Sequence, residues 1–283
     1  MTRSLEARLL EHHERDAVLD HLRSEPRTNL FLMDLVARFG SAPSPGETRA
    51  EVAVVRRAGE IVGVAALRPT IVLDAGIGPE AIEALLPFVE ALSIGLVKSP
   101  EPAVAAMWRH LRGRRGRQAI VDRNETAYAL EEGSAHLAGP PRGSTARSAA
   151  KADLDALVYA ARESLREENR PDPFAGDARS FRRWVRGRVP RARVVESDGR
   201  ILFVGYADVQ RPEGWLLQGI YTWPDERRRG FGAAGTSQLC REAFREGAAH
   251  VQLAVVDGNR PARALYERLG FEPFARLRTI LFA

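Results

Sequence analysis

The stretch Pro224-Asp225-Glu226-Arg227-Arg228-Arg229-Gly230-Phe231-Gly232-Ala233 lies between a strand-like run, Trp215 to Trp223, and a helix-like run that ends near Glu246. Its glycines allow a ligand to approach the backbone closely, and the following helix offers unpaired amides and the positive end of its dipole. The arginines add positive charge. This stretch therefore predicts a binding site for a diphosphate, and with it an anionic nucleotide cofactor.

A second motif begins about 27 residues further on and reads Asn259-Arg260-Pro261-Ala262-Arg263-Ala264-Leu265-Tyr266-Glu267-Arg268-Leu269-Gly270-Phe271. The two motifs together resemble the GNAT family of acyl-CoA-dependent N-acetyltransferases. The family's phosphate loop reads Arg/Gln-x-x-Gly-x-Gly/Ala, which Arg227, Gly230 and Gly232 match. Its closing motif, Asn-x-x-Ala-x-x-Leu-Tyr-x-x-x-Gly-Phe, is matched at every letter. Either motif alone is weak, whereas the pair in this order and spacing is specific.

The resemblance implies that the chain binds acetyl-CoA as a cosubstrate. In this family two neighbouring strands diverge beside the phosphate loop, and the pantetheine arm inserts between them like a further strand. Backbone amides of the loop then surround the phosphates, with Arg227 or Arg228 adding side-chain charge. An ordinary helix start with solvated arginines is the alternative that the loop alone leaves open. The expected cofactor-binding residues are Ile220, Tyr221, Thr222, Arg227, Arg228, Arg229, Gly230, Phe231, Gly232, Ala233, Asn259 and Ala262.

The resemblance also assigns catalytic roles. The family's tyrosine at the position of Tyr266 protonates the departing thiolate, and the alternative is a core tyrosine that packs under Phe271. Asn259 can cap its helix while reaching the cofactor. Deprotonating the amine requires a base, and we expect Glu168, at the end of a helix that lines the acceptor pocket in GNAT folds. Many members carry a glutamate on the diverging strand where this chain has Gln218, which argues against a base there.

The order of predicted elements repeats once along the chain. Residues 1–132 read as a strand, two helices, a meander, a helix, a strand, a helix and a closing strand, and residues 147–283 repeat the helices, the meander and the final elements. Residues 133–146, rich in glycine and proline, read as a linker. We therefore expect a mixed α/β (α+β) chain of two GNAT-like domains. Each has a central, mostly antiparallel sheet with helices on both faces.

The first domain is expected to be a degenerate copy. Before its helix at Pro79 the chain reads Ala75-Gly76-Ile77-Gly78, with no arginine at the offset that a phosphate loop requires. An unrelated α/β domain is the alternative for this half. The two halves also differ in charge. Residues 1–140 carry 17 basic and 19 acidic groups, whereas residues 141–283 carry 25 basic and 18 acidic groups. The half with the phosphate loop is the basic half, as binding of a polyphosphate favours.

The composition argues against disulfides, a metal site, a membrane span and nucleic-acid binding. The single cysteine, Cys240, cannot form an internal disulfide and fits a buried position in a reducing cytoplasm. The six histidines form no metal-spaced set, so no metal is expected. No apolar run is long enough to span a membrane, and the N-terminus has no signal core. The arginines are scattered without interleaved aromatic residues, which ranks nucleic-acid binding last.

The predicted function is that of a cytoplasmic N-acetyltransferase. A small-molecule or peptide amine attacks the thioester of acetyl-CoA directly in a ternary complex, without a covalent enzyme intermediate. The alternative is a non-catalytic acyl-CoA sensor that uses the first half to engage a partner protein. The acceptor cannot be read from the sequence, and a homodimer remains open.

Overall fold

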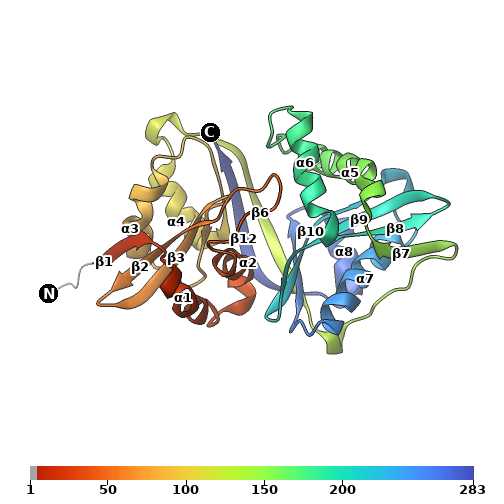
Figure 1. The fold of residues 1–283 in the computed structure, drawn as a ribbon, viewed down its shortest axis with the longest axis horizontal. Helices are drawn as coiled ribbons and strands as arrows, with labels where there is room; N and C mark the ends of the chain where they lie inside the picture. Colours follow the sequence, from red (N-terminus) through yellow and green to blue (C-terminus); the bar gives the residue numbers. More distant parts are fainter. Residues whose placement is uncertain (1–4) are drawn as a thin grey trace.

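The computed structural model describes residues 5–283. Residues 1–4, which belong to the predicted N-terminal domain and to the N-terminal segment expected to lack a signal core, lie outside the described residues. The chain forms two lobes side by side, with two long strands running between them (Figure 1). Each lobe places helices on both faces of a sheet. Within the described residues no helix is long and apolar enough to cross a membrane.

The N-terminal lobe contains a four-stranded antiparallel sheet in the order β1-β2-β3-β4. Pro26 and Pro79 begin two of its helices, at a position where the missing amide hydrogen costs nothing. The elements are β1 (Leu5–Leu9), α1 (Arg15–Leu22), α2 (Pro26–Ala37), β2 (Glu51–Arg57), β3 (Glu60–Arg68), β4 (Val72–Leu73), α3 (Pro79–Val89), β5 (Gly95–Pro100), α4 (Glu101–Leu111) and β6 (Ala119–Leu130).

The C-terminal lobe contributes most of an eight-stranded sheet in the order β5-β12-β6-β11-β10-β9-β8-β7. Helices α5 and α6 cover one face of its strands, and α7 and α8 cover the other (Figure 1). The elements are β7 (Ser144–Ser148), α5 (Leu154–Glu167), α6 (Ala178–Arg188), β8 (Ala192–Ser197), β9 (Arg200–Arg211), β10 (Gly214–Thr222), α7 (Phe231–Arg245), β11 (Val251–Val256), α8 (Arg260–Arg268) and β12 (Glu272–Phe282).

The last strands of the two halves are exchanged. Strand β12, at the end of the chain, pairs with β5 of the first half, and β6, from the first half, pairs with β11 of the second. The two exchanged strands also pair with each other along almost their full length. We expected each closing strand to complete its own half, and this expectation is wrong. Both β6 and β12 have the alternating pattern of a strand in the middle of a sheet. This pattern does not specify which strand lies beside each of them.

Packing fixes the exchange. Ile280 and Phe282 of β12 are completely buried in the core of the N-terminal lobe, together with α3 and α4. Each such side chain contributes about 2–3 kcal/mol through burial. From the other direction, Leu30 of α2 packs on Val209 and Leu216 of the C-terminal sheet. Each lobe therefore completes the core of the other.

The predicted linker is held against α7. The Ala138 amide donates to the Ser237 hydroxyl (3.0 Å), and Arg241 donates to the Ala138 carbonyl (2.8 Å). Further along, Pro141 lies beside Gly230. Strand β7 begins at Ser144, within the stretch where we expected no regular element. It forms because its backbone pairs with β8 and so becomes the edge strand of the sheet, a non-local contact that a glycine- and proline-rich context does not reveal.

Candidate active site

Strands β10 and β11 diverge immediately after they meet. Among the described residues their parallel pairing is confined to Trp215 with Val251 and Leu216 with Gln252. Beyond that point β10 keeps β9 on one side, with an irregularity between Gln218 and Tyr221. Within it, Gly219 has a left-handed φ of 57° and is exposed. The edge of β10 that faces β11 is therefore open to a strand-like ligand.

The phosphate loop lies at the start of α7. Gly230 caps the helix with a left-handed φ of 91°, and Arg228 also has a positive φ of 63°. The first helical hydrogen bond runs from the Ala234 amide to the Gly230 carbonyl (3.0 Å). The amides of Phe231, Gly232 and Ala233 precede it and are the unpaired donors of a helix N-terminus. With no side chain capping them, they can bind an anion.

The three arginines of the loop lie in different surroundings. The Arg227 guanidinium donates to both carboxylate oxygens of Glu167 (2.7 Å each) and to the Thr222 carbonyl (3.1 Å), so it is engaged within the protein. Arg229 pairs with Glu226 and lies over the Phe231 ring. The exposed Arg228 has no ionic partner within residues 5–283. Of the two arginines that we expected to add charge, Arg228 is the one whose side chain is free.

The loop, the diverging strand and the tyrosine helix meet around Gly232. A side chain at Gly232 would lie 3.3 Å from Leu265 of α8 and 3.3 Å from the Thr222 hydroxyl of β10. Glycine is needed here because helix and strand approach each other so closely. Ile220 packs toward α7, whereas Tyr221 points to the opposite face, toward α5. The side chains of Ile220 and Tyr221 therefore lie on opposite faces of β10.

Tyr266 follows Leu265 on α8. Its ring packs edge-to-face against Phe271, with 5.7 Å between centroids, in a core that includes Cys240. Burial, reinforced by Cys240, raises the pKa of the Tyr266 hydroxyl. The phenol is therefore protonated at neutral pH and, among the described residues, donates to no side chain or carbonyl. The core role and the role of a proton donor are both compatible with this position.

Asn259 caps α8, since its side-chain oxygen accepts the Ala262 amide at 3.2 Å. The cap uses the amide of Ala262 and the helix uses its carbonyl, so Ala262 can offer a cofactor only its methyl group. Asn259 itself is exposed, and its amide group has free hydrogen-bonding capacity.

The C-terminal end of α5 lies over the other face of the divergence. Glu167 accepts from the Tyr221 hydroxyl at 3.4 Å while pairing with Arg227. Burial and the Glu167 carboxylate raise the pKa of Tyr221 to about 12, so this phenol is also protonated. Glu167 thus joins α5 to the phosphate loop. Helix periodicity in the sequence did not show that Glu167, and not the neighbouring Glu168, makes this contact.

Glu168 reaches across to the exchanged strand. Its carboxylate accepts from Arg123 of β6 at 3.0 Å and lies 3.5 Å from Arg170. Arg123 also contacts the buried Glu125, which pairs with Lys98 of β5 at 2.5 Å. Burial alone raises the pKa of Glu125, but Lys98, the Thr279 hydroxyl and Arg123 outweigh it and lower the pKa from 4.5 to about 2. Sequence reasoning missed Arg123 and Glu125, which approach α5 through the strand exchange.

In the N-terminal lobe the turn that leads into α3 is built around Asp74. The Asp74 carboxylate accepts the Gly76 amide (2.6 Å) and the Val64 amide (3.1 Å) ahead of α3. Beside β4, the Ser99 hydroxyl accepts the Leu73 amide at 2.7 Å. A carboxylate thus holds the turn before α3 and a hydroxyl bridges to β4, and this turn has no counterpart of the arginines that precede α7.

Cys240 is completely buried, and burial raises the pKa of its thiol, so it remains protonated within the core. Residues 5–283 contain no group of three His, Cys, Asp or Glu side chains placed to hold a metal ion.

Comparison with known proteins identifies the C-terminal half. Residues 157–271 match the profile of the acetyltransferase (GNAT) family. A search of curated protein sequences gave no significant match. Among solved structures, a Drosophila protein superimposes with a TM-score of 0.73 at 16% identity, covering 98% of this chain and 99% of that one.

Two other structures resemble the whole chain and carry descriptive names. A tandem GNAT protein from the clavulanic acid biosynthesis pathway has a TM-score of 0.61 at 17% identity, covering 99% of this chain and 98% of its own. A GCN5-related N-acetyltransferase from Sphaerobacter thermophilus has a TM-score of 0.60 at 15% identity, with 98% and 95% coverage. At these identities the likeness establishes the fold, and it confirms the mixed α/β architecture with two GNAT-like halves.

Proposed function

Because residues 157–271 form a GNAT acetyltransferase domain within a tandem GNAT fold, we propose that this protein transfers an acetyl group from acetyl-CoA to an amine. The observation that supports this most directly is the convergence around Gly232 of three features. They are the open edge of β10, the unpaired amides at the start of α7, and the α8 helix that carries Tyr266.

The residues present suit acetyl-CoA. The amides of Phe231, Gly232 and Ala233 would hold its diphosphate, Arg228 would add charge, and the backbone of Ile220 to Thr222 would pair with the pantetheine arm. Bound acetyl-CoA would supply the thioester that the amine attacks. The domain boundaries that we propose, 1–132 and 147–283, assign this whole site to the second half.

Tyr266 would act as the general acid for the departing thiolate. Its raised pKa keeps the phenol protonated at neutral pH, so the acid holds its proton when the thiolate leaves.

An amine must lose a proton to attack. Glu168 is the proposed base, since it lies at the exposed end of α5 on the face of β10 that is opposite to α7. Its two arginine partners, Arg123 and Arg170, hold the carboxylate in place.

The experiment combines calorimetry of acetyl-CoA binding with release of free thiol in the presence of an amine panel. We expect Tyr266→Phe to retain binding and to slow thiol release by about a hundredfold or more. The matched control is Tyr128→Phe, because Tyr128 is a buried tyrosine of the same core. A Tyr266→Phe variant as fast as the parent would remove the proposed acid.

The alternative of a non-catalytic acyl-CoA-binding protein is decided by the same measurements. Binding of acetyl-CoA with no turnover of any amine would favour it. Absence of binding would overturn both functions.

A further inference from the structure

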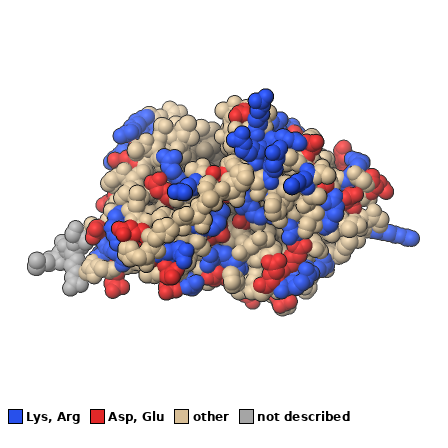
Figure 2. Space-filling model, in the orientation of Figure 1, with Lys and Arg blue, Asp and Glu red and all other residues tan. Residues whose placement is uncertain are grey.

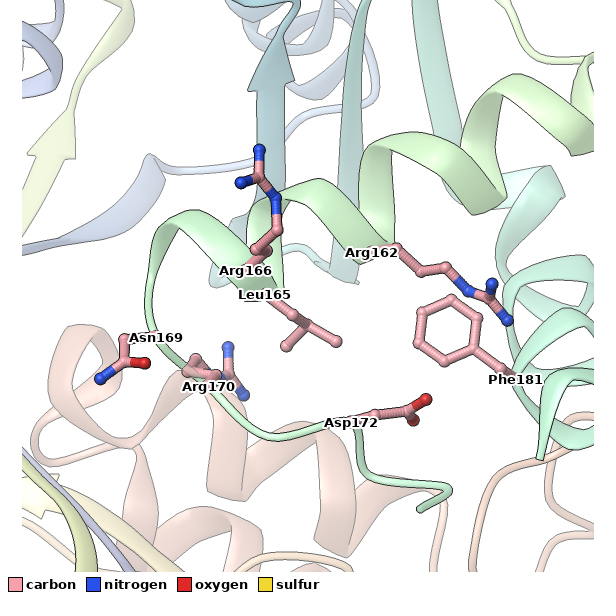
Figure 3. A pocket seen from close by; sticks show the side chains of 7 residues that line it. All are labelled: Arg162, Leu165, Arg166, Asn169, Arg170, Asp172 and Phe181. Carbon is pink, nitrogen blue, oxygen red and sulfur yellow. The ribbon is translucent and has the colours of Figure 1, made fainter. Parts of the chain in front are cut away.

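A cavity of about 340 Å³ lies between α5, the loop that follows it and α6 (Figure 3). This volume is near the lower end of the range for small-molecule sites. The lining residues are Arg162, Leu165, Arg166, Asn169, Arg170, Asp172 and Phe181. The completely buried Phe181 and the half-buried Leu165 give it an apolar side, and its charged lining residues are three arginines and one carboxylate.

The arginines of the cavity are not equally engaged. Arg166 pairs with Glu163 at 2.6 Å and points away from the other lining residues (Figure 3). Arg170 is 3.5 Å from Glu168. Arg162 lies over the Phe181 ring, 5.1 Å from its centroid, and no carboxylate within residues 5–283 is close enough to form an ion pair with it. Its guanidinium is therefore available to an anion.

The carboxylate of the cavity does not neutralise Arg162. Asp172 accepts the Phe174 amide at 2.8 Å, which holds the loop in shape. Arg162 and Asp172 both extend toward Phe181 but form no ion pair with each other (Figure 3). A ligand can therefore meet the guanidinium without displacing an internal partner.

The surface around the cavity is basic. Arginine side chains gather over α5 and α6, beside a recess between the two lobes (Figure 2). Such a field raises the local concentration of anions. The cavity also shares the end of α5 with Glu167 and Glu168, which reach the diverging strand and β6. A molecule bound here lies next to the segment that borders the proposed reaction site.

We propose that this cavity receives an acidic group of the amine acceptor, a carboxylate or a phosphate, with Arg162 as its principal ligand. This inference rests on the proposed function and specifies the class of acceptor. A planar guanidinium binds either group with two parallel hydrogen bonds, and Phe181 keeps it in place by stacking. Arg170 adds a second positive charge, and Leu165 contacts the apolar part of the acceptor.

The test uses the full chain and pairs of amines that differ in one acidic group. Amino acids are compared with their amides, and aminoalkyl phosphates with the corresponding alcohols, by thiol release with saturating acetyl-CoA. We expect kcat/KM to be at least tenfold higher for the acidic member of the preferred pair. Arg162→Gln should remove this preference through KM and leave the neutral amines unaffected, and Arg162→Lys should retain part of it.

Arg179→Gln is the matched control for net charge, because Arg179 is an exposed arginine of α6 outside the cavity. It should leave the preference unchanged. The inference is overturned if neutral amines react as well as their acidic counterparts, if no acidic amine reacts, or if Arg162→Gln does not alter the ratio. An equal effect of Arg179→Gln would also overturn it. Calorimetry distinguishes failure of this inference from failure of the proposed function, since absence of acetyl-CoA binding to the parent protein contradicts the proposed function itself.

Discussion

Replacing Glu125 by glutamine should destabilise the whole molecule, because this carboxylate joins the exchanged strands. It pairs with Lys98 of β5, accepts from Thr279 of β12 at 2.6 Å and contacts Arg123 of its own strand. Lowering the pKa from 4.5 to about 2 corresponds to roughly 3 kcal/mol of stability at neutral pH. Glu125→Gln also leaves the Lys98 ammonium without its carboxylate partner, so we expect a loss of about 3 kcal/mol or more.

The pH dependence has a definite sign. Because the pKa of Glu125 is lower in the folded than in the unfolded chain, its stabilisation is fully present above about pH 5 and is lost as the pH falls toward 2. Between pH 5 and pH 3 the parent should lose roughly 2 kcal/mol from this group alone. Glu125→Gln should lack that component, so the difference between the two proteins should shrink on acidification.

Urea unfolding at a series of pH values measures both effects. The matched control is Asp122→Asn, because Asp122 lies on the same strand and pairs with Arg278 of β12 at 2.7 Å, but is 39% exposed. An exposed pair of this kind should contribute less than about 1 kcal/mol. The reasoning fails if Glu125→Gln costs no more than Asp122→Asn, or if its stability falls with pH as steeply as that of the parent.

Three further predictions concern the loop, its link to α5 and the exchange. Gly230→Ala should cost about 1–2 kcal/mol because of the left-handed φ, and should weaken coenzyme A binding. Gly59→Ala, at an equally left-handed turn, is the control and should cost as much stability but leave coenzyme A binding intact. Calorimetry that shows equal coenzyme A affinity for the two variants would contradict this prediction. Glu167→Gln should free its arginine partner and tighten coenzyme A binding by up to about fivefold, with stability changed by less than about 1 kcal/mol, so weaker binding would contradict the assignment. Chains 1–139 and 140–283 should be insoluble when expressed apart and should assemble when expressed together, and a soluble, folded single half would disprove the mutual dependence of the lobes.

The sequence predicted the elements around the cofactor site well. Helices α7 and α8 and strand β11 lie within a few residues of their expected positions, because glycine and proline mark their ends clearly. Gly230 and Asn259 act through local geometry, a left-handed turn and a helix cap, and local geometry can be predicted from local sequence. The mixed α/β class followed from the same order of elements.

Long-range pairing could not be predicted in this way. The alternation along β6 and β12 specifies a strand with two different faces, but not which strand lies beside it. The same limit applies to β7, whose residues form a strand because β8 offers an edge. On α5, one helical step separates Glu167 from Glu168, and tertiary contacts alone show which of them contacts Tyr221 and which contacts Arg123.

The exchange of closing strands bears on why the first half of the chain persists without a phosphate loop. Its strand β6 is the immediate neighbour of β11, the strand that borders the divergence. A chain that lost this half would lose the strand that flanks β11 as well as a fold partner. The first half can therefore be retained as scaffold, free to accumulate changes wherever it does not touch the second.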